Sequence, residues 1–90
     1  MPRYMVERIF PEGLNIPMDA SGDEALGKVI KTNGEQGVNW VHSYVSADKT
    51  RSFCIYDAPT PEAIRRVAAD NALPVENITE ISVLAPYFYR

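Results

Sequence analysis

Two stretches of alternating side chains, separated by a short polar turn, constrain the fold of this chain most. Residues 40–44 read WVHSY and residues 53–56 read FCIY. Both have the period of two that is typical of a β-strand, in which successive side chains point to opposite faces. Residues 47–50 (ADKT) form a short polar turn between them. The sequence therefore predicts an antiparallel hairpin with strands over residues 37–46 and 50–56.

The alternation also divides the hairpin side chains into two sets. We expect one set to face the core and the other to face away from it. The predicted core set is Val41, Val45, Phe53 and Ile55, and the predicted opposite set is Trp40, His42, Tyr44, Cys54 and Tyr56. Because the second set contains the only His, the only Cys and the only Trp of the chain, we expect unusual chemistry on that face.

The remaining segments extend this hairpin into a complete α+β pattern. Residues 3–10 and 78–84 are rich in β-formers and predict two further strands. A capping box at residues 21–24 (SGDE) predicts a helix that ends near Asn33-Gly34, and Thr60 followed by Pro61 predicts the start of a second helix. The order β-α-β-β-α-β predicts a single ferredoxin-like domain over residues 1–90. Its four-stranded antiparallel sheet has the strand order 4-1-3-2 and two helices on one face.

Composition narrows the classes of function. With 90 residues and a net charge of −3, the chain lacks the basic patch of a nucleic-acid-binding protein. We expect no membrane partner, because no apolar run approaches the length of a membrane span. A single cysteine and the absence of a signal-peptide pattern favour a cytoplasmic protein. No nucleophile elbow, phosphate loop or glycine-rich fingerprint supports an enzyme.

The sheet face that the helices leave uncovered predicts an interaction surface. It would expose Trp40, Tyr44 and Tyr56, and exposed apolar patches of this kind usually mark a contact with another protein. We therefore expect a homodimer with two-fold symmetry, formed through the open sheet face or through sheet edges.

Three side chains on this face are candidates for a metal site. The strand order places residues 3–10 beside residues 50–56, so Glu7 can lie near Cys54, with His42 across the hairpin. Carboxylate, imidazole and thiolate together suit nickel, zinc or copper. The face of Glu7 stays open, because Tyr4, Val6 and Arg8 form the opposite set of the same strand.

Other interpretations of these residues remain. His42 and Cys54 sit in no short metal-ligand motif, and either can be a structural residue of a strand. Alternatively, His42 is the polar anchor or general base of an aromatic pocket in a dimeric α+β barrel that binds or converts a small molecule. A dimer without any ligand is the third interpretation.

The hairpin motif also resembles a known family. Residues 40–45 (WVHSYV) and 53–59 (FCIYDAP), followed by residues 61–64 (PEAI) and 73–74 (LP), are similar to a family of small bacterial proteins of unknown function, often labelled nickel-binding protein. The resemblance implies a ferredoxin-like fold, a homodimer and a bound metal, with no established reaction. On the matching positions it favours His42 as a nickel ligand, followed by Cys54 and Glu7.

Overall fold

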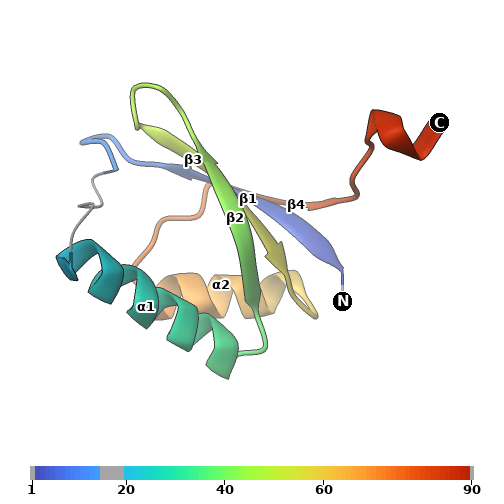
Figure 1. Ribbon diagram of the computed structural model, residues 1–90. Coiled ribbons are helices and arrows are strands. Elements are labelled where there is room, and N and C mark those ends of the chain that lie inside the picture. The colour runs from blue at the N-terminus through green and yellow to red at the C-terminus, as the bar shows by residue number, and fades with distance from the viewer. Residues whose placement is uncertain (1, 15–19, 90) are drawn as a thin grey trace.

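The computed structural model describes residues 2–14 and 20–89, and it contains one four-stranded sheet and two helices (Figure 1). The order of elements is the predicted β-α-β-β-α-β. In chain order the elements are β1 (Arg3–Ile9), α1 (Ala20–Glu35), β2 (Asn39–Val45), β3 (Arg51–Asp57), α2 (Pro61–Asp70), β4 (Asn77–Ile81) and a final 3₁₀ turn (Pro86–Tyr89).

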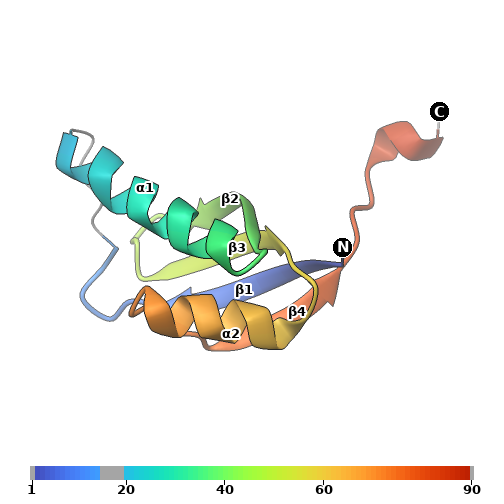
Figure 2. The ribbon, with the colours of Figure 1, turned by 90° about the horizontal axis from the view of Figure 1, so that it is seen from below.

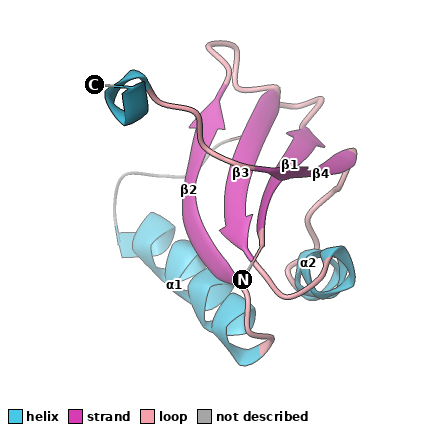
Figure 3. Ribbon diagram, turned by 90° about the vertical axis from the view of Figure 1, so that its right-hand side faces the viewer, coloured by secondary structure: helices cyan, strands magenta, loops and turns pink. Residues whose placement is uncertain are grey.

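The sheet has the order β2-β3-β1-β4 with every pair antiparallel, which confirms the predicted ferredoxin-like topology. Both helices lie on the same face of the sheet, and the other face is free of helices (Figures 2 and 3). The two faces therefore have different surroundings, and the face to which a strand residue points decides its chemistry.

The core lies between the sheet and α2. Ile64 and Val67 on α2 are almost fully buried, as are Tyr4 and Val6 on β1. Thr60 caps α2 as predicted: its hydroxyl accepts a hydrogen bond from the Ala63 amide at 3.2 Å. The apolar stripe of α2 thus fixes that helix against the central strands.

The two ends of α1 differ from the prediction. The helix already includes Ala20, so it begins before Ser21, where the sequence predicted the N-cap. At the other end the helix passes Asn33 and Gly34 and stops before Gly37, which has a φ of 71°. The Val38 amide donates to the Asn33 carbonyl at 2.9 Å. Gly37, and not Gly34, therefore supplies the left-handed residue that ends the helix.

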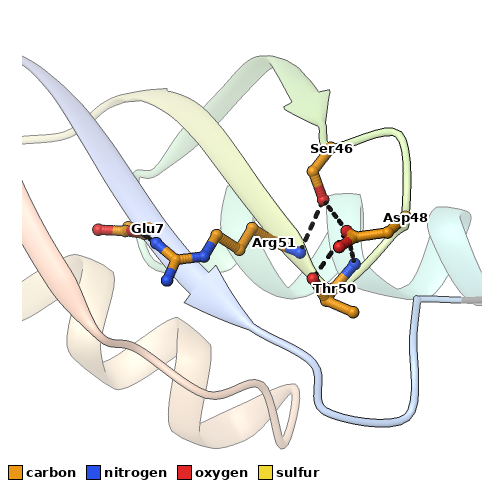
Figure 4. A network of polar contacts seen from close by, with 5 residues as sticks. All are labelled: Glu7, Ser46, Asp48, Thr50 and Arg51. Carbon is orange, nitrogen blue, oxygen red and sulfur yellow. Dashed lines mark hydrogen bonds and ion pairs between the residues drawn. The ribbon is translucent and has the colours of Figure 1, made fainter.

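A side-chain network closes the β2–β3 hairpin (Figure 4). One carboxylate oxygen of Asp48 accepts from the Ser46 hydroxyl at 2.7 Å, from the Thr50 amide at 3.0 Å and from the Thr50 hydroxyl at 2.7 Å. These hydrogen bonds lower the pKa of Asp48 to about 2. The turn thereby fixes the register that positions the side chains of both strands.

Strand β4 is shorter than the sequence predicts. It ends at Ile81, opposite Arg3, which is the first residue of β1. Beyond this point β4 has no neighbouring strand, so residues 82–85 leave the sheet. The segment that follows extends away from both helices (Figures 1 and 2). No helix among the described residues is long and apolar enough to cross a membrane.

Candidate functional site

His42 lies on the open face of the sheet, near the middle of β2. Its side chain is exposed and forms an edge-to-face contact with Tyr44, with ring centroids 5.1 Å apart. Within residues 2–14 and 20–89 its ring nitrogens make no hydrogen bond that would hold them. The imidazole is therefore free to bind a ligand from the open side.

Glu7 lies on the same face, on β1, which settles the choice that the sequence left open. Its neighbours Val6 and Arg8 are buried under the helices, so Glu7 points to the open side. Its carboxylate accepts a hydrogen bond from the Arg51 guanidinium at 2.8 Å (Figure 4). Because β3 lies between β1 and β2, two strand spacings, about 10 Å, separate the lines of Glu7 and His42 across the sheet.

Cys54 lies on the opposite face, and the predicted grouping of the hairpin residues was wrong on this point. Across the strands His42 pairs with Ile55 and Tyr44 pairs with Phe53, while Cys54 pairs with Ser43. Residues directly opposite each other share a face. Phe53 and Ile55 therefore accompany His42, and Cys54 belongs to the buried core.

A β-bulge completes the regrouping. The β2–β3 register shifts between Trp40 and His42, so Val41 is an extra residue. Because an extra residue reverses the alternation, Trp40 packs on the helix side and its indole N–H donates to the Ser43 hydroxyl at 2.8 Å. The prediction that Trp40, Cys54 and Tyr56 share a face with His42 was therefore wrong.

The three candidate ligands do not meet in one chain. His42 and Glu7 share the open face but lie on strands that are not adjacent, and Cys54 faces the helices. Among the described residues no group of three or more His, Cys, Asp and Glu side chains is placed to hold a metal ion. One chain therefore offers a nitrogen donor and an oxygen donor on the open face, without a closed coordination site.

On the helix side the structure contains a cavity of about 160 Å³. It lies between α1 and the sheet, with Leu26 and Val29 of α1 on one side and Trp40 and Tyr56 on the other. Trp40 and Tyr56, which the sequence placed on the face of His42, thus line a cavity on the other face. Among the described lining residues, Arg8 is the one that carries a charge.

Arg8 is the functional candidate that the sequence analysis missed. Its side chain is 2% exposed, and its Nε and Nη1 atoms have no hydrogen-bond partner among the residues that the structure describes. The guanidinium carbon lies 5.7 Å from the centre of the Tyr56 ring. Burial raises the pKa of Tyr56, and the positive charge of Arg8 partly opposes this rise. The available signal was the alternation of β1, which places Arg8 with Tyr4 and Val6.

Comparisons with known proteins agree with this architecture. A family model described as "Nickel responsive protein SCO4226-like" matches residues 4–81. The crystal structure of SCO4226 from Streptomyces coelicolor A3(2) superposes with a TM-score of 0.73 at 16% sequence identity, covering 92% of this chain and 99% of the other. At this identity the superposition supports the fold alone. Curated proteins give no significant match.

Proposed function

The chain belongs to the SCO4226-like family of nickel-responsive proteins, and from this premise we propose that it binds Ni²⁺ as a homodimer. The proposed site takes His42 and Glu7 from each of two subunits. The observation that carries the proposal is the exposed imidazole of His42 on an uncovered sheet face, in a chain whose family is nickel-responsive.

The donor chemistry fits nickel when two subunits contribute. Imidazole is a good nickel ligand, and four nitrogen and oxygen donors in a tetragonal arrangement are typical of Ni²⁺ or Cu²⁺. One subunit supplies His42 and Glu7, and a two-fold axis doubles this set to two nitrogens and two carboxylates. Arg51, which pairs with Glu7, is half-exposed and can move away when the carboxylate binds a metal. Cys54 faces the core and is not part of the proposed site.

The apolar character of the open side supports the dimer. Tyr44 on β2 is 63% exposed, and Phe53 of β3 lies opposite it. The segment that follows β4 also has large apolar side chains that are exposed, namely Val83, Leu84, Tyr87 and Phe88. Burying such groups against a second copy removes apolar surface from water. We propose that the open face forms the dimer interface and that the segment after β4 packs on the partner.

The test is a calorimetric titration of Ni²⁺ into the tag-free protein, with Zn²⁺ as competitor, beside the His42→Ala and Glu7→Gln variants. Cys54→Ser is the matched control, because it changes a thiol on the other face. We expect saturation at one nickel per dimer in the unchanged protein and in Cys54→Ser. His42→Ala should lose binding, and Glu7→Gln should weaken it.

The oligomeric state is measured in parallel by light scattering during gel filtration, with and without Ni²⁺. We expect a dimer in both conditions and also for His42→Ala. Absence of saturable nickel binding in the unchanged protein would refute the metal proposal. Tight binding by a monomer, or loss of binding in Cys54→Ser, would refute the shared open-face site.

A further inference from the structure

We infer that the cavity between α1 and the sheet is a binding site for a small organic carboxylate, whose anionic group pairs with Arg8 and whose apolar body fills the rest. This site is on the opposite face of the sheet from His42 and Glu7, and it does not depend on the proposed metal. Two observations support it: buried N–H donors of Arg8 have no partner among the described residues, and the walls of the cavity are mostly apolar.

Among residues 2–14 and 20–89, no carboxylate forms an ion pair with the buried guanidinium of Arg8. Arginine keeps its positive charge in proteins and offers five N–H donors. Two of its three nitrogen atoms, Nε and Nη1, have no hydrogen-bond partner in the described part of the chain. No aspartate or glutamate occurs among the described residues that line the cavity. Because a buried charge is costly unless it is paired, these two donors favour the binding of an anion.

The positive charge behind the free donors favours an anionic acceptor such as a carboxylate. A carboxylate accepts charge-assisted hydrogen bonds from a guanidinium, and these are stronger than neutral ones. Other polar groups in the wall are largely occupied with one another. The Ser43 hydroxyl accepts from Trp40 at 2.8 Å, and the Ser52 hydroxyl lies 3.7 Å from the Cys54 sulfur. Arg8 is therefore the group that selects the charge of the ligand.

The rest of the cavity selects an apolar body. Its walls consist largely of apolar and aromatic side chains, among them Phe10, Leu26, Val29, Trp40 and Leu73. Its volume of about 160 Å³ is similar to that of a dry apolar cavity of about 150 Å³ that binds benzene in another protein. A free inorganic anion would leave these walls without contacts. A monocarboxylate carrying one aromatic ring or a short branched chain satisfies both the walls and Arg8.

The experiment is a calorimetric titration of benzoate, with a chelator present so that metal plays no part. Benzamide is the neutral probe of the same shape, and sulfate is the competing inorganic anion. The variants are Arg8→Met, which removes the charge, and Arg65→Met, which removes an exposed arginine of α2. Val29→Phe, on α1, fills the cavity and leaves Arg8 in place.

We expect saturable binding of benzoate to the unchanged protein and to Arg65→Met. Binding should fall by at least about tenfold in Arg8→Met, the loss typical of hydrogen bonds to a charged group, and it should disappear in Val29→Phe. If Arg8→Met does not fold, Val29→Phe decides the result. No binding to the unchanged protein, or equal affinity for benzamide, would overturn the inference. Unchanged binding in Val29→Phe, or displacement of benzoate by equimolar sulfate, would also overturn it.

Discussion

Replacing Arg8 by methionine should make the protein more stable, although it deletes a charged side chain from the centre of the fold. Each buried donor without a partner costs about 1–3 kcal/mol, and Arg8 has two such atoms. The variant loses a contact between the guanidinium and the Tyr56 ring, 5.7 Å from its centroid, worth about 0.5–2 kcal/mol. Methionine occupies irregular apolar space without a donor. We expect a rise of about 1–4 kcal/mol in the free energy of unfolding, comparable to other replacements of buried ionic groups.

The assay is urea unfolding followed by the fluorescence of Trp40, which lines the same cavity and is the only tryptophan. For a chain of this size each kcal/mol also raises Tm by about 4–8 °C. Arg65→Met is the control, since a change at this exposed position should stay within about 0.5 kcal/mol. A loss of stability in Arg8→Met greater than about 1 kcal/mol would refute the reasoning, because it would mean that the Arg8 charge is satisfied in the native protein.

Three further predictions concern the core, the hairpin turn and the end of α1. Ile64→Ala should lower the free energy of unfolding by about 2–5 kcal/mol, measured by urea unfolding, because Ile64 is fully buried; a loss below about 1 kcal/mol would contradict the core position. NMR titration should give Asp48 a pKa of about 2, and Ser46→Ala should raise that pKa by removing one hydrogen bond. Because the folded pKa of Asp48 lies below the ordinary 3.8, its contribution to stability is present above that pH and is lost as the pH falls towards 2. Gly37→Ala should cost about 1–2 kcal/mol in chemical unfolding through backbone strain alone, because a Cβ at this position meets no atom within 4 Å; an unchanged stability would contradict the left-handed φ.

Local patterns carried enough information to predict the fold. Alternation identified the hairpin strands, and Thr60 with Pro61 identified the start of α2. Once the order β-α-β-β-α-β is known, the short hairpin and the need to cover one sheet face leave few arrangements. The observed strand order is the one that this reasoning predicts. Misplaced boundaries, such as the end of β4 at Ile81, arose where pairing with a neighbouring strand, and not the sequence of the segment, sets the length.

The candidate site was less accessible to sequence reasoning. Strand β3 carries apolar residues on both faces, since Phe53 and Ile55 alternate with Cys54 and Tyr56. Hydrophobicity alone therefore could not say which pair faces the helices. The alternation of β1 did place Arg8 beside Val6, but a charged residue on a buried face contradicts the usual pattern. Such a residue points to a binding site only when the structure shows that it is buried and that its donors are unpaired among the described residues.

By itself the sequence determined which segments form strands and helices, and which residues of one regular strand share a face. These properties depend on neighbours in the chain and on a period of two or 3.6. Only the tertiary structure decided which face each set occupies. It did so through the single extra residue at Val41, and through helices that cover Cys54 and Arg8 and leave His42 and Glu7 open. A one-residue shift costs little locally but moves a side chain to the other side of the sheet.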